Sequence, residues 1–102
     1  MLDSGSTDGT VAVAAELGAR VHHRPFTTFP EQRNAALDLA RGRWVFFVDA
    51  DERVTDELRE EIESIVRGPG EPFAGYWVPR RNVILGRWMR HAGWYPDHQL
   101  RL

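Results

Sequence analysis

Two acidic segments in this chain of 102 residues carry the residue types that phosphate chemistry uses. The first is Asp3, which is followed by a turn rich in serine and glycine, and the second is Asp49-Ala50-Asp51-Glu52. An Asp-x-Asp pair suits Mg²⁺ or Mn²⁺ beside a diphosphate, because such ions take one or two carboxylates and complete an octahedron with phosphate oxygens and water. A structural reading stays open, in which Asp49 caps its turn and Glu52 favours the next helix N-terminus.

The elements around these segments predict where the carboxylates lie. Trp44 to Val48 is a continuous run of β-branched and aromatic residues, which predicts a strand buried on both faces. This run ends directly in the second acidic segment, and Met1-Leu2 would end another strand just before Asp3. Because ligands of open α/β sheets bind at the carboxyl ends of the strands, we expect both acidic segments at ligand-binding positions.

Helices and strands alternate along the chain. Capping residues and apolar periodicity predict helices that start near residue 6, 28 and 55 and stop at Gly18, Gly42 and the Gly68-Pro69-Gly70 segment. The third helix is expected to turn inward the apolar side chains of Leu58, Ile62, Ile65 and Val66. Further strands are predicted at 19–23, 73–79, 81–85 and 98–102. This order indicates an α/β fold, a sandwich with a largely parallel sheet.

The composition limits the class of protein. A chain of 11.7 kDa forms one small domain at most. It has no cysteine, which excludes a disulfide framework, a thiolate zinc site and a cysteine nucleophile. No secretory leader is visible, and the longest apolar run is too short to span a bilayer. We therefore expect a cytoplasmic protein.

The net charge of −2 hides an asymmetry. Residues 1–67 hold 13 acidic side chains against 8 arginines, whereas residues 68–102 hold 2 against 5. The basic residues other than histidine are all arginine, whose planar guanidinium matches phosphate and carboxylate partners. Nucleic acid is disfavoured as a partner, because the net charge is negative and no basic helix is predicted.

Three ordered blocks make the chain recognisable. Leu2-Asp3-Ser4-Gly5-Ser6-Thr7-Asp8-Gly9-Thr10 resembles the DxGSTDGT signature of family 2 glycosyltransferases, which have the GT-A (Rossmann-like) three-layer sandwich fold. The segments 32–37 and 40–52 are similar to that family's helix, strand and Asp-x-Asp block. The tail, Gly93-Trp94-Tyr95-Pro96-Asp97 and then Gln99-Leu100-Arg101-Leu102, resembles the branch of lipopolysaccharide-core-type glucosyltransferases.

The resemblance implies roles for individual residues of the nucleotide-sugar half, 1–67. Asp3 would contact the base or ribose of the donor, and Asp49 would lie near the ribose. Asp51 would bind a divalent cation, Mn²⁺ or Mg²⁺, that holds the donor diphosphate. Arg33 or Asn34 would line the donor pocket, although a solvated helix face explains these two residues equally well.

The departures from the family pattern concern both ends of the chain. Family members open with a strand that carries a Pro-x-Tyr-Asn-like motif, which is missing here, so the chain looks truncated. Inverting members also use a carboxylate base to deprotonate the acceptor hydroxyl, and in this branch we expect it beyond Leu102. Asp97 is the one candidate for the base after Glu71, and the alternative is an ordinary turn residue.

The sequence predicts two groups of tryptophans, one in the core and one on the acceptor side. The acceptor-side region would begin in residues 68–102. Trp44 and Trp77 lie in predicted strands and are expected in the core. Trp88 and Trp94 lie in glycine-punctuated loops near Arg90, where they would stack on a sugar acceptor or, alternatively, seal the small core. Nearby arginines would meet acceptor phosphates or anionic lipid headgroups, or form a solvated basic face; they are Arg80, Arg81, Arg87 and Arg90.

These observations predict one partial GT-A domain. Its expected reaction is metal-dependent, inverting transfer of a hexose from a nucleoside-diphosphate sugar to a hydroxyl of a glycan or lipid-linked acceptor, in cell-envelope glycan synthesis. The expected location is the cytoplasm, with contact at the inner face of the membrane as an option. Two alternatives stay open: a non-catalytic nucleotide-sugar-binding module, and a fragment that self-associates through an exposed sheet edge.

Overall fold

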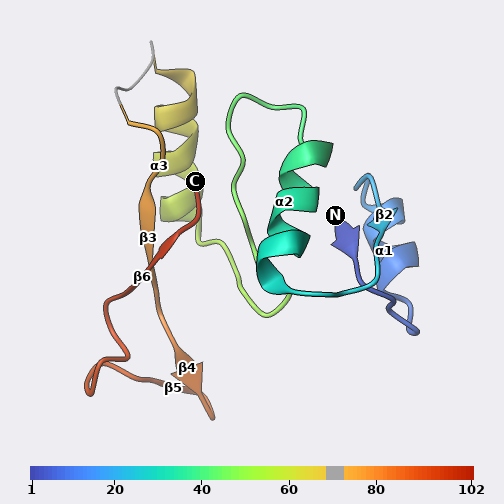
Figure 1. Cartoon of the computed structure of the whole chain (residues 1–102). Coiled ribbons are helices and arrows are strands. Elements are labelled where there is room, and N and C mark those ends of the chain that lie inside the picture. The colour runs from blue at the N-terminus through green and yellow to red at the C-terminus, as the bar shows by residue number, and fades with distance from the viewer. Residues whose placement is uncertain (69–72) are drawn as a thin grey trace. The chain divides into compact units, whose positions relative to one another are not determined.

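The computed structural model describes residues 1–68 and 73–102, which belong to two compact units (Figure 1). The first unit comprises residues 1–42 and the second residues 43–102. The boundary between the two units thus follows Gly42. The boundary that the sequence predicts, between a nucleotide-sugar half and an acceptor-side region, lies between residues 67 and 68.

The first unit is built on a short parallel strand pair. Strand β1 (Leu2–Asp3) pairs in parallel with β2 (His22–His23), and helix α1 (Thr10–Glu16) connects them. The register sets Asp3 beside His23. Helix α2 (Phe29–Leu39) follows β2 and completes the unit. Strand–helix–strand order is therefore present, as predicted, with Asp3 at the end of its strand.

The two helices of this unit begin differently: α1 follows Gly9, beyond the start predicted near residue 6 and without a side-chain cap, whereas α2 begins at the predicted cap Thr28. The Asp8 side chain accepts a hydrogen bond from the Thr10 N–H at 3.0 Å, just before α1. The Thr28 hydroxyl accepts one from the Glu31 N–H at 3.4 Å, at the start of α2. The Glu31 carboxylate bonds the hydroxyl of Thr27, so the capping box is only half formed.

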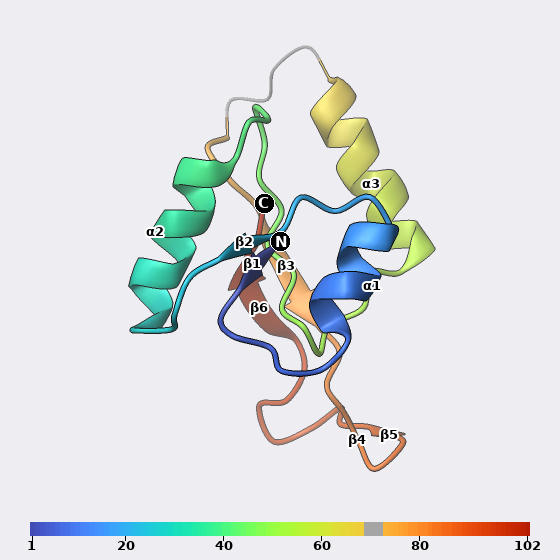
Figure 2. The same cartoon turned by 90° about the vertical axis from the view of Figure 1, so that its right-hand side faces the viewer.

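The second unit combines one helix with two antiparallel strand pairs (Figure 2). Thr55 caps helix α3 (Asp56–Arg67), accepting a hydrogen bond from the Leu58 N–H at 3.2 Å. Strand β3 (Trp77–Arg80) pairs with β6 (Asp97–Leu100), in a register that sets Arg80 opposite Asp97. Strand β4 (Val83–Ile84) pairs with β5 (Arg87–Trp88) in a hairpin.

The apolar side of α3 faces β3. Leu58, Ile62 and Ile65 are half-buried and line a hollow of about 80 Å³ together with residues of β3. Val66, which we expected to face inward, is exposed. Gly68 follows the last helical turn, and the rest of the predicted helix stop, Pro69-Gly70, lies outside the described residues.

The prediction of a strand at residues 44–48 is wrong. These residues are in no strand, although the Phe47 N–H donates a hydrogen bond to the Arg101 carbonyl at 2.9 Å. A strand requires a ladder of such bonds, and apolar composition alone does not supply the partner. Among residues 1–68 and 73–102 two of the three strand pairs are antiparallel, so these pairs do not form the expected largely parallel sheet. The fold is a mixed arrangement of helices and small sheets.

Few side chains are buried in either unit. In the described part of the chain the buried residues are Asp3, Arg101 and Leu102. The prediction that Trp77 is a core residue is wrong, because 65% of it is exposed. Trp44 is half-buried and contacts Tyr76, with ring centroids 5.8 Å apart. Within the described residues no helix is long and apolar enough to cross a membrane.

Candidate functional site

The first acidic segment is a turn that closes on the Asp3 carboxylate. Oxygen Oδ2 accepts hydrogen bonds from the Gly5 N–H at 2.9 Å and the Ser6 N–H at 3.1 Å. The Ser6 hydroxyl donates to Oδ1 at 2.5 Å. His23 Nδ1 lies 3.3 Å from Oδ2, across the β1–β2 pair. Asp3 is only 7% exposed, so this polar cluster replaces the water that its carboxylate would otherwise bind.

These hydrogen bonds favour the ionised form of the Asp3 carboxyl group. The Ser6 hydroxyl, and after it the Gly5 backbone N–H, lower the pKa of Asp3 to about 2. The turn also requires a glycine, because Gly5 has a φ of 112°, in the region that side chains disfavour. Asp3 is therefore ionised at neutral pH and organises the serine- and glycine-rich turn that follows it.

Helix α2 joins this turn through one contact. Gln32 Nε2 donates to the Ser4 hydroxyl oxygen at 2.9 Å. The predicted donor residues Arg33 and Asn34 follow directly in the helix; Arg33 is half-buried and Asn34 is exposed. The structure thus sets both in the same unit as Asp3, and their contact with a donor stays a prediction.

The second acidic segment is held by an arginine distant in sequence. Arg101 Nη2 donates to Asp49 Oδ2 at 2.7 Å and to Glu52 Oε1 at 2.5 Å. Within the turn, the Glu52 N–H donates to the Asp49 carbonyl at 3.0 Å, and the Asp49 N–H donates to Glu52 Oε2 at 2.9 Å. Asp49 and Glu52 therefore close the turn on each other and share one guanidinium.

Arg101 is an unusual residue because it is charged and buried, with 5% of its surface exposed. Burial lowers the pKa of Arg101, but the carboxylates of Asp49 and Glu52 outweigh that effect and raise it above its ordinary value. Its Nε and Nη1 atoms are buried without a hydrogen-bond partner among the described residues. A buried cation of this kind is held in place by its ion pairs.

Asp97, the predicted base, lies in a second ion pair of the same unit. Arg80 Nε and Nη2 donate to Asp97 Oδ2 at 2.9 and 2.5 Å, and Gln99 Nε2 donates to Oδ1 at 2.9 Å. The hydrogen bonds from Arg80, first among the causes, lower the pKa of Asp97. A general base works best with a pKa near the operating pH. These contacts favour a structural role for Asp97, and its role as the base stays a prediction.

Asp51 differs from both neighbouring acids of its turn. It is exposed, and in the part of the chain that the structure describes its carboxylate has no hydrogen-bond or ion-pair partner. No group of three or more metal-ligating side chains occurs among these residues. The arrangement still fits Mg²⁺ or Mn²⁺ on a diphosphate, since one or two carboxylates suffice when phosphates and water fill the other positions.

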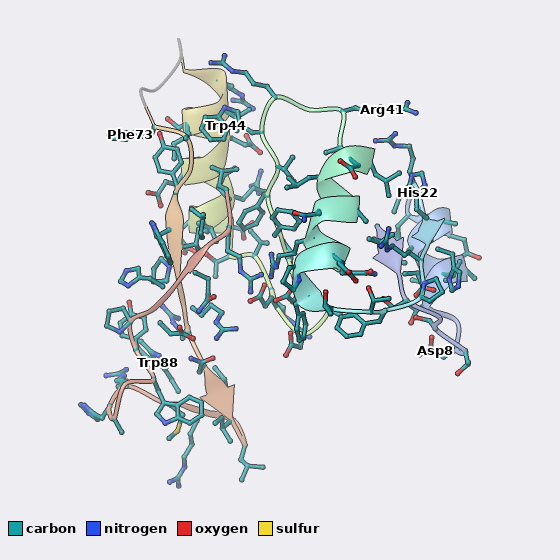
Figure 3. All side chains as sticks on the ribbon, viewed as in Figure 1. Asp8, His22, Arg41, Trp44, Phe73 and Trp88 are labelled. Atoms are coloured by element: carbon teal, nitrogen blue, oxygen red, sulfur yellow. The ribbon has the colours of Figure 1, made fainter. Side chains whose placement is uncertain are left out.

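Of the acceptor-side residues predicted from sequence, Trp88 (labelled in Figure 3) has the most ring contacts. The guanidinium carbons of Arg81 and Arg90 lie 4.5 and 4.1 Å from the Trp88 ring centroid. The Tyr95 ring meets the same indole edge to face, at 5.1 Å. Trp94 is exposed, and its carbonyl accepts a hydrogen bond from Asn82 at 3.0 Å. Trp88 and Arg90 are thus brought together, and their contact with an acceptor stays a prediction.

Arg101 is the residue that the sequence analysis misses. It lies within the quoted segment Gln99-Leu100-Arg101-Leu102 but is given no role there. Its position between two leucines near the end of a strand is the one available signal, because a charge in an apolar context needs a buried partner. The partner itself, 52 positions earlier, could not be read from local sequence.

Each unit thus carries one acidic turn, on a mixed fold of helices and small sheets. Comparison with known proteins identifies the family. The model of glycosyl transferase family 2 matches residues 1–101, so the chain belongs to that family.

Several curated proteins are similar to this chain over part of their length. An uncharacterized glycosyltransferase of Rickettsia conorii is 45% identical over 65 residues, which cover 64% of this chain and 23% of that protein. The lipopolysaccharide core biosynthesis glycosyltransferase LpsC of Rhizobium meliloti is 34% identical over 91 residues, covering 84% of this chain and 33% of LpsC. The aligned regions are thus a quarter to a third of these relatives. No solved structure matches the chain.

Proposed function

We propose that this chain is the donor-side part of a glycosyltransferase with the GT-A sandwich fold. The reaction would transfer a hexose from a nucleoside-diphosphate sugar to a hydroxyl, with inversion, on a glycan or lipid-linked acceptor of the cell envelope. Membership of family 2 and the similarity to LpsC, named for lipopolysaccharide core biosynthesis, support this proposal. A cytoplasmic location is part of the same proposal.

The observation that carries the proposal is a difference between the carboxylates of the second acidic turn. Arg101 takes up Asp49 and Glu52, while Asp51 stays exposed and without a partner among the described residues. Asp51 would hold the divalent cation, and that cation, when bound, would neutralise charge on the departing diphosphate. The side chain of Asp49 remains 49% exposed, so its carboxylate can accept from a ribose hydroxyl while paired with Arg101.

The first unit would contribute separately to donor binding. Asp3, ionised and buried, holds the turn of residues 4–6 in one conformation. We propose that this turn, with Asp3 at its root, contacts the nucleoside. Arg33 and Asn34 on α2 would lie beside the donor, the arginine offering a guanidinium to its phosphates.

A second candidate function is a nucleotide-sugar-binding module without catalysis. The contacts of Asp97 favour it, because a carboxylate held by Arg80, Gln99 and Asn82 is a poor proton acceptor. Turnover of a nucleotide sugar by the purified chain distinguishes the two functions. Release of free hexose or a glycosylated product supports the transferase, and binding without turnover supports the module.

The experiment that tests the metal assignment is Asp51→Asn. We expect Mn²⁺ binding in the presence of uridine diphosphate, measured by electron paramagnetic resonance, to weaken at least about tenfold, because the variant loses the carboxylate charge. The melting temperature should not change, since Asp51 is exposed. Asp38→Asn on α2 is the matched control, an exposed aspartate outside the turn. Unchanged Mn²⁺ affinity in Asp51→Asn would refute the assignment.

A further inference from the structure

A second surface of the chain stands apart from the acidic turns. We name residues 81–96 the arginine hairpin; they comprise strands β4 and β5 and the loop that follows. This segment holds three arginines and one histidine but no acidic residue. Figures 1 and 2 both show the hairpin extending beyond the β3–β6 pair, on the side away from α3. Its charge is therefore uniformly positive in an otherwise acidic chain.

The tip of the arginine hairpin is apolar and exposed. Val83 and Ile84 are both exposed although they are neighbours in a strand, so both faces of β4 present aliphatic groups to solvent. Leu85 is 99% exposed at the turn, where it and Gly86 have φ angles of 48° and 76°. L side chains rarely adopt this left-handed conformation, and the Leu85 side chain is too exposed to gain packing contacts from it.

The same segment also holds arginines and aromatic rings. Arg81 and Arg90 lie against the Trp88 ring, and such cation–π contacts hold their charges beside the hairpin. Arg87 adds a third exposed charge from β5. Trp94 and Tyr95 are exposed in the loop, and their side chains suit a boundary where one end is apolar and the other wet.

We propose that the arginine hairpin docks onto an anionic phospholipid surface. The tip, Val83 to Leu85, would enter the boundary between headgroups and acyl chains, and the three arginines would meet lipid phosphates. Charge complementarity selects this partner. A second copy of the chain would bring three further arginines against the first three, and like charges in contact oppose such pairing. The proposal goes beyond glycosyl transfer and does not depend on it.

The test is flotation of the 102-residue chain with two kinds of vesicle, phosphatidylcholine alone and phosphatidylcholine with about 30% phosphatidylglycerol. We expect binding to the anionic vesicles only, and weaker binding at high salt. Replacing Arg81, Arg87 and Arg90 together by glutamine should weaken it about a hundredfold, since each arginine contributes about fivefold. Three exposed arginines outside the hairpin serve as the control for glutamine replacement: Arg41, Arg43 and Arg53.

The apolar contribution is tested with Leu85→Asn. Asparagine tolerates the left-handed backbone of this position, and the side chain packs on nothing, so the variant keeps the fold. Binding to anionic vesicles should weaken about tenfold. Leu17→Asn replaces another highly exposed leucine, 82% exposed, and should leave binding unchanged.

Three results would overturn the proposal. They are equal binding to neutral and anionic vesicles, equal losses in Leu17→Asn and Leu85→Asn, and self-association that depends on Leu85 without any vesicle binding. None of these readouts involves a nucleotide or a metal. Loss of Mn²⁺ binding in Asp51→Asn therefore tests the proposed function, and vesicle binding tests the hairpin, each independently of the other.

Discussion

The two acidic turns hold their carboxylates in opposite ways. Asp3 is bonded within its own turn, by Gly5 and Ser6, and across one strand pair by His23. Asp49 and Glu52 depend on Arg101, which lies 52 and 49 positions further along the chain. A turn of the first kind is specified by its own residues. A turn of the second kind has local hydrogen bonds between Asp49 and Glu52, but the cation for its carboxylates comes only from the fold of the second unit.

The difference extends to electrostatics. Neutral donors, the Ser6 hydroxyl and backbone N–H groups, keep Asp3 ionised with a pKa of about 2. In the second turn a buried guanidinium, that of Arg101, instead pairs with both Asp49 and Glu52. The hydrogen-bond donors of the first turn all bind the one carboxylate of Asp3. In the second turn one guanidinium binds two carboxylates, and that of Asp51 has no partner among the described residues.

The largest effect is expected when the distant partner is removed. Arg101→Met should lower the free energy of unfolding by about 2–3 kcal/mol, because it leaves Asp49 and Glu52 without their cation in a partly buried turn. Urea-induced unfolding measures the change. The loss is at the lower end for a buried pair because Asp49 reaches solvent.

An exposed ion pair of the same unit provides the control. Arg67 donates to Glu63 at 2.8 Å on the surface of α3, and Arg67→Met should change the unfolding free energy by less than about 0.5 kcal/mol. An equal loss of unfolding free energy in Arg101→Met and Arg67→Met would show that the ion pairs of Arg101 stabilise the fold no more than an exposed pair does.

Acid should affect the first turn in a predictable range of pH. The folded pKa of Asp3, about 2, lies below its ordinary value of 3.8. The contacts of its carboxylate therefore stabilise the folded state fully above about pH 5, and this stabilisation is lost as the pH falls through 4 toward 2. An NMR titration of the Asp3 carboxyl carbon measures the midpoint. A midpoint near 3.8 would contradict the closed turn.

The smallest effect is expected when one hydrogen-bond donor to Asp3 is removed. Ser6→Ala removes the hydroxyl that contributes most to the low pKa of Asp3, and the pKa should rise toward its ordinary value. The same carboxyl titration detects the rise. Ser4→Ala is the control, because the Ser4 hydroxyl bonds Gln32 and not Asp3. A pKa of Asp3 that moved equally in both variants would show a general loosening of the turn.

Local features of the fold could be predicted from the sequence. The starts of α2 and α3 follow from Thr28 and Thr55, since a capping hydroxyl and the backbone N–H that donates to it lie within three residues of each other. Asp3 at the end of a strand, followed by a tight turn, is likewise a local pattern. The same reasoning predicts strands at 73–79, 81–85 and 98–102, which overlap β3, β4 and β6.

Features that depend on distant partners could not be predicted. The run from Trp44 to Val48 has the composition of a buried strand, but pairing requires a neighbour that composition does not name. Trp77 lies in a strand as expected, yet 65% of it is exposed, because membership of a strand does not decide how much of a side chain its neighbours cover. The roles of Arg80 and Arg101 depend on register and tertiary placement, which local sequence leaves open.

The separation between Arg101 and its carboxylate partners also sets an order of events during synthesis. Residues 3–6 leave the ribosome together, so the first turn can close as soon as they emerge. The turn of residues 49–52 must wait for about fifty more residues, a few seconds or more at the usual rate of translation. Until then Asp49 and Glu52 repel each other without a cation between them. The second turn is thus completed well after the first.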